Sequence, residues 1–69
     1  MLNGEKISIT ELIIRLNPRE HLLTPNKRYL LYLAREYVNG VPTREILDEL
    51  PIVANVEGYE LTDFNYKKL

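Results

Sequence analysis

Apolar side chains recur with the period of an α-helix at the beginning of this chain. The first such stripe is spaced i, i+3, i+4, i+7 and consists of Ile9, Leu12, Ile13 and Leu16. Ser8, followed three positions later by Glu11, has the pattern of a capping box, in which the hydroxyl accepts a bond from an otherwise unpaired backbone N–H. Pro18 disfavours a helical conformation in the residue before it, so we expect this helix to end at about Leu16.

A second helix is predicted from Thr24 to about Asn39. Thr24 has a hydroxyl suited to an N-cap, and Pro25 occupies the one helical position where a missing N–H costs nothing. Gly40 stands where the residue after a helix commonly adopts a positive φ. The predicted buried stripe consists of Leu30, Leu33, Ala34, Tyr37 and Val38.

The remainder of the chain predicts a short helix and then a hairpin. The helix is expected over residues 42–50, anchored by Ile46, Leu47 and Leu50, with Pro51 ending it. Residues 52–56 and 59–64 favour strands, with Glu57-Gly58 as the turn between them. Tyr59 and Leu61 share one face of the second strand while Phe64 and Tyr66 fall on the other, so either a bulge intervenes or Thr62 caps a final helical turn. We therefore predict a single α+β domain over residues 1–69, with three helices and a C-terminal β-hairpin; a winged-helix-like arrangement of these elements is an alternative.

Composition narrows the class of protein. A chain of 69 residues has room for one small core, and its stability is marginal enough to make oligomerisation an option. It has no cysteine and so forms no disulfides, which is compatible with a reducing compartment. No apolar run approaches the length of a membrane span, about 18 residues. The N-terminus also lacks the basic start and apolar core of a signal peptide, so we expect a cytoplasmic protein that does not contact a membrane.

The charges are unevenly distributed along the chain. Residues 15–44 hold six basic and two acidic side chains, whereas residues 45–65 hold six acidic side chains and no basic one. Such a charge dipole can orient a partner or a second copy, but it gives no general attraction to nucleic acid. Mimicry of nucleic acid by the acidic residues 45–63 is a weaker alternative.

The sequence offers little for catalysis. Ser8 is explained as a helix cap, His21 is the only histidine, and no lysine follows a phosphate-binding glycine loop. Asp48 and Glu49 are adjacent, so on a helix they point about 100° apart and are poorly placed to share a metal ion. We therefore predict a protein that is not an enzyme and that holds no metal or cofactor.

One stretch resembles a family of DNA-binding domains. Residues 23–50, "LTPNKRYLLYLAREYVNGVPTREILDEL", are similar to the first part of helix-turn-helix domains of the LuxR and sigma-factor type, in which "LTP" opens a helix and "TREI" begins the next. The resemblance implies a transcriptional regulator, with Thr43 and Arg44 as DNA-contacting residues. In those families a further, basic helix enters the major groove, whereas "PIVANVEGYE" follows here.

The second helix also carries a candidate protein-binding face. Tyrosine and arginine are enriched at binding hot spots, and this face consists of Arg28, Tyr29, Leu31, Tyr32 and Arg35. Alternatively, Leu31 and Tyr32 pack inside the domain.

Our leading hypothesis is a small non-catalytic regulatory or accessory protein, of the size common in phages and mobile elements, which acts by binding a protein partner. A homodimer through this face is also predicted, in which its arginines meet Glu45, Asp48 or Glu49 of another copy.

Overall fold

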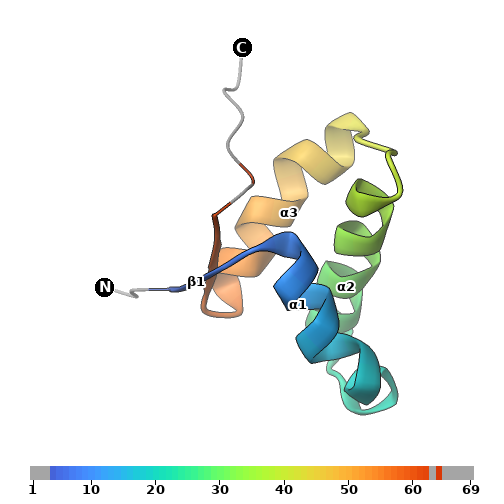
Figure 1. Cartoon of the computed structure of the whole chain (residues 1–69), viewed down its shortest axis with the longest axis vertical. Helices are drawn as coiled ribbons and strands as arrows, with labels where there is room; N and C mark the ends of the chain where they lie inside the picture. Colours follow the sequence, from blue (N-terminus) through green and yellow to red (C-terminus); the bar gives the residue numbers. More distant parts are fainter. Residues whose placement is uncertain (1–3, 63, 65–69) are drawn as a thin grey trace.

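The computed structural model describes residues 4–62 and 64, which form three α-helices and a small sheet (Figure 1). The elements in chain order are β1 (Glu5–Ile7), α1 (Ile9–Leu16), the 3-10 helix η1 (Asn17–Leu22), α2 (Pro25–Val38), α3 (Arg44–Val56) and β2 (Tyr59–Leu61). Helix α2 packs against both α1 and α3, while β2 lies beside α3 and β1. The predicted small α+β fold is therefore confirmed.

The starts of α1 and α2 are where the capping residues indicated, whereas α3 begins at Arg44 instead of residue 42, after an N-cap, Thr43, that was not predicted. The hydroxyl oxygens of Ser8, Thr24 and Thr43 accept hydrogen bonds from the N–H three residues further on, at 3.0, 3.5 and 3.3 Å. Each bond satisfies one donor that the first turn of a helix leaves unpaired. At the other end of α2, Gly40 has φ of +84°, which confirms the left-handed residue predicted after that helix.

The core is formed by one side of each helix together with β1. Its buried residues are Ile7, Ile9, Leu12, Leu16, Leu23, Leu30, Leu31, Leu33, Ala34, Ile46, Leu50 and Ala54. Ile13, Tyr37 and Leu47, also predicted for the core, are only half-buried. The prediction for Val38 is wrong, because its side chain is 53% exposed at the last position of α2, where the chain turns away toward α3.

Pro51 lies inside α3 instead of ending it. Helix α3 runs from Arg44 to Val56, so the predicted helix end at Leu50 and the predicted strand over 52–56 are both wrong. The physical reason is the spacing of Ile46, Leu50 and Ala54, which are all buried and lie four residues apart on one side of the helix. Burial of this stripe outweighs the strand preference of the β-branched residues and the cost of the proline.

The predicted hairpin is also wrong, because β2 pairs with β1 and the two strands are parallel. Glu5 aligns with Tyr59 and Ile7 with Leu61, so the N-terminal and C-terminal segments of the described chain lie side by side. β2 ends at Leu61, before the predicted strand end at residue 64, and residue 63 of that prediction, like Tyr66, lies outside the described residues. Gly4 lies close to this pairing: a Cβ atom there would stand 3.0 Å from the Tyr59 carbonyl carbon. The sheet therefore joins two segments that are distant in sequence.

Candidate protein-binding face of helices α2 and α3

The five residues predicted as a binding face do not all reach the surface. Arg28 and Tyr32 lie one helical turn apart on the outer side of α2, and Tyr32 is 54% exposed. Leu31 is 1% exposed and belongs to the core. The alternative in which Leu31 packs inside the domain is therefore the one found, whereas Tyr32 remains accessible.

Tyr29 connects this part of α2 to α3. Its phenol O–H donates a hydrogen bond to the carboxylate of Glu45, with 2.8 Å between the oxygens. The pKa of Tyr29 is raised, first by this bond to Glu45 and then by partial burial, with smaller contributions from Glu49 and Tyr32. The two tyrosines and the two acids therefore share one neighbourhood, to which α2 contributes the rings and α3 the carboxylates.

Arg35 has a structural role. Its guanidinium donates to the side-chain oxygen of Asn17 and forms an ion pair with Glu20 at 2.7 Å. The bond from Arg35 holds the pKa of Glu20 below its usual range, with a smaller contribution from the charge of Arg28. Arg35 therefore ties η1 to α2 and is largely occupied within the chain.

Arg28 borders a depression on the η1 side of α2. The depression has a volume of about 360 Å³ and is lined by Asn17, Glu20, His21 and Arg28. Within residues 4–62 and 64, Arg28 forms no ion pair. Its charge helps to lower the pKa of Glu20, but the Glu20 carboxylate is paired with Arg35. This border of the face therefore carries a positive charge that the described chain does not neutralise.

The opposite border is acidic, and its continuation into Ile52 and Val56 was missed from the sequence. Glu45, Glu49, Ile52 and Val56 follow the spacing i, i+4, i+7, i+11 along α3, and all four are exposed. The signal is present in the sequence, but it appears only once the helix is known to continue beyond Pro51. We refer to Arg28, Tyr29, Tyr32, Glu45 and Glu49 together as the α2–α3 face.

The predicted DNA-contacting residues lie at the start of α3. Thr43 is the N-cap, and its hydroxyl accepts a bond from the N–H of Ile46. Arg44, the first residue of the helix, is exposed. The acids of α3 follow directly, and in the described part of the chain α3 is followed by β2 and not by a further helix.

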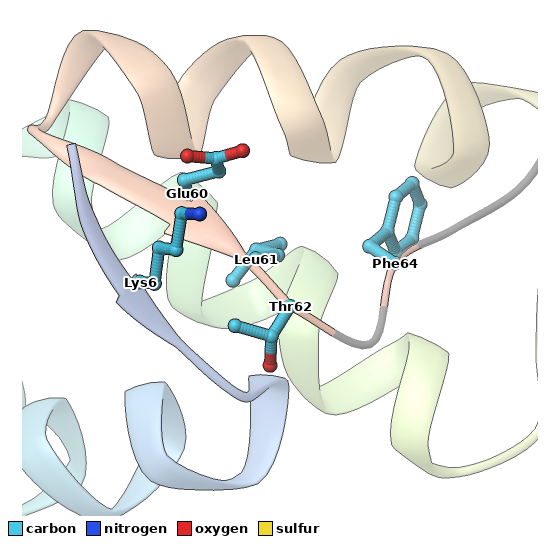
Figure 2. Close-up of a pocket in the computed structure, with 5 residues that line it drawn as sticks. All are labelled: Lys6, Glu60, Leu61, Thr62 and Phe64. Carbon is cyan, nitrogen blue, oxygen red and sulfur yellow. The ribbon is translucent and has the colours of Figure 1, made fainter. Parts of the chain in front are cut away.

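A second depression, lined by Lys6, Glu60, Leu61, Thr62 and Phe64, lies on the outside of the sheet (Figure 2). Figure 2 shows Lys6 and Glu60 extending from neighbouring strands, at paired positions of the register. Phe64 instead packs on Tyr37 of α2, with 5.0 Å between ring centres.

Ser8 and His21, the residues considered for catalysis, lie in different surroundings. Ser8 is engaged as a cap, and His21 is exposed on η1. Across residues 4–62 and 64 there is no cluster of three or more histidine, aspartate or glutamate side chains placed to hold a metal ion. The exposed side chains of the α2–α3 face are aromatic and charged.

Comparison with known proteins assigns no family. No protein-family model, curated protein or solved structure matches the chain. None of the helices in the described ranges has both the length and the apolar character needed to cross a membrane.

Proposed function

We propose that this chain is a small, non-catalytic regulatory protein of the cytoplasm, which acts by binding another protein through the α2–α3 face. One grouping of side chains supports this most directly. Tyr32, which is exposed, and Arg28, which has no ion-pair partner among the described residues, lie beside the Tyr29–Glu45 hydrogen bond. Tyrosine and arginine combine a large contact area with polar tips, which is why they dominate binding energy at protein interfaces. The bond to Glu45 also holds Tyr29 in place, so part of the face is ordered before a partner arrives.

The experiment is a capture of partners from the source cell with immobilised protein. Native protein is compared with Arg28→Ala/Tyr32→Ala, and the matched control is Ile14→Ala, which removes an apolar side chain 59% exposed on α1. We expect a protein retained by the native chain and the control but lost from the double variant. Retention of the same proteins by all three, with each folded by circular dichroism, would overturn the proposal that this face binds them.

A helix-turn-helix regulator is the second candidate, favoured by the resemblance over residues 23–50 and by the short connection 39–43 between α2 and α3 (Figure 1). In that case Thr43 and Arg44 would contact DNA. Glu45, Asp48 and Glu49 would then lie near phosphates and oppose the release of counterions that drives such binding. Titration of duplex DNA at low and physiological salt separates the two functions, because tight binding to a specific duplex at physiological salt would favour the second.

A further inference from the structure

The α2–α3 face has three bands of different chemistry. Arg28 forms a basic border on the η1 side, Tyr29 and Tyr32 form the middle, and Glu45 and Glu49 form an acidic border on α3. Neither border is neutralised by an ion pair from the described residues. The acidic band continues along α3 into Ile52, which is 58% exposed.

A face with this order of bands is complementary to itself. Rotation by 180° about an axis through the tyrosines reverses the order, so that the basic border of one copy meets the acidic border of the other. The tyrosines then meet each other near the axis. A head-to-tail arrangement would instead leave unpaired borders at both ends of a growing chain, whereas the two-fold arrangement closes.

We propose that the partner of the α2–α3 face is a second copy of this chain, in an isologous dimer in which Arg28 of each protomer pairs with Glu49 of the other. This inference rests on the choice of face made in the proposed function and names its occupant. Each dimer has two such charge pairs, and charge complementarity of this kind fixes the register between partners.

The available surface is sufficient for such a dimer. A stable interface takes about 800 Å² from each partner, and the described chain exposes 4931 Å² in all. About a sixth of the surface is therefore needed, which the outer sides of two adjacent helices of 14 and 13 residues can supply. Burial of exposed Tyr32 and Ile52 would add apolar contact at this surface.

Charge exchange tests the proposed pairing. Sedimentation equilibrium over low to high micromolar concentration is measured for the native protein, Arg28→Glu, Glu49→Arg and the double variant. We expect a native dimer that each single variant weakens by about a hundredfold, because like charges then face each other twice across the interface. The double variant restores dimerisation. An equimolar mixture of the two single variants also restores it, since both pairs are then again of opposite charge.

Lys6→Glu is the matched control, because it makes the same change of charge at an exposed position on the sheet. It should leave the dimer intact. A native protein that stays monomeric at high micromolar concentration overturns the inference, while the capture experiment still decides whether the face binds a different protein. Single variants that dimerise like the native chain, or a mixture that fails to recover, overturn the Arg28–Glu49 pairing.

Discussion

Replacement of Pro51 by alanine tests whether α3 is one continuous helix. Pro51 lies in the interior of α3, where proline has no N–H to donate to the carbonyl four residues before it and its ring crowds that carbonyl. In a helix interior, proline is about 3 kcal/mol less favourable than alanine. The ring is half-buried, and losing its packing offsets about 1 kcal/mol of that gain. The greater freedom of alanine in the unfolded chain offsets about 0.4–1 kcal/mol more. We therefore expect Pro51→Ala to raise the free energy of unfolding by about 1–2 kcal/mol.

The assay is equilibrium unfolding in urea followed by circular dichroism. For a small domain with a slope of about 1 kcal/mol per molar urea, the expected gain moves the midpoint upward by about 1–2 M. The matched control is Pro25→Ala at the first position of α2, where no helical hydrogen bond is missing. There we expect a loss of about 0.4–1 kcal/mol, because alanine gives the unfolded chain more freedom. An unchanged or lower midpoint for Pro51→Ala would refute the reasoning that this proline opposes α3.

Four further substitutions have defined expectations in the same unfolding assay. Ser8→Ala removes the cap of α1 and should cost about 1 kcal/mol, whereas no loss would show that the 3.0 Å bond contributes nothing. Gly4→Ala places a methyl group against the backbone of Tyr59, so a loss of about 1–3 kcal/mol is expected, and full stability would mean that β1 shifts without strain. Leu31→Ala should cost about 2–5 kcal/mol, and Tyr32→Ala less than about 1 kcal/mol. Equal losses from these last two would contradict their different burial.

Local signals in the sequence predicted the starts of α1 and α2 and the turn after α2. A capping hydroxyl acts on a backbone donor three residues away, so Ser8 and Thr24 indicate helix starts without knowledge of the rest of the fold. The same holds for Gly40, because its positive φ is a property of the turn itself. These features depend on short stretches of chain, which is why the sequence alone was sufficient for them.

Features that depend on tertiary contacts were not predictable in this way. The valines and isoleucine after Pro51 have a strand preference, and only the packing of Leu50 and Ala54 in the core makes them helical. The residues of the candidate face were partly predicted, since the periodicity of α2 groups Arg28 with Tyr32, and Tyr29 lies beside them. The burial of Leu31 was left open as an alternative, and the engagement of Arg35 with Glu20 was not predicted, because both depend on where α1 and η1 pack.

The parallel pairing of β1 with β2 has a consequence for the order in which the molecule folds. Glu5 meets Tyr59, so this contact closes a loop that contains almost the whole chain, whereas α1, α2 and α3 meet through short connections. Closing a long loop lowers the conformational entropy of the chain before the strand contacts that offset this cost have formed. Contacts between distant segments therefore slow folding. The helices should therefore assemble first and the sheet last. In refolding followed by pulsed hydrogen exchange, protection of the Glu5 amide, which donates to the Gly58 carbonyl, should appear after protection of the amides within α2.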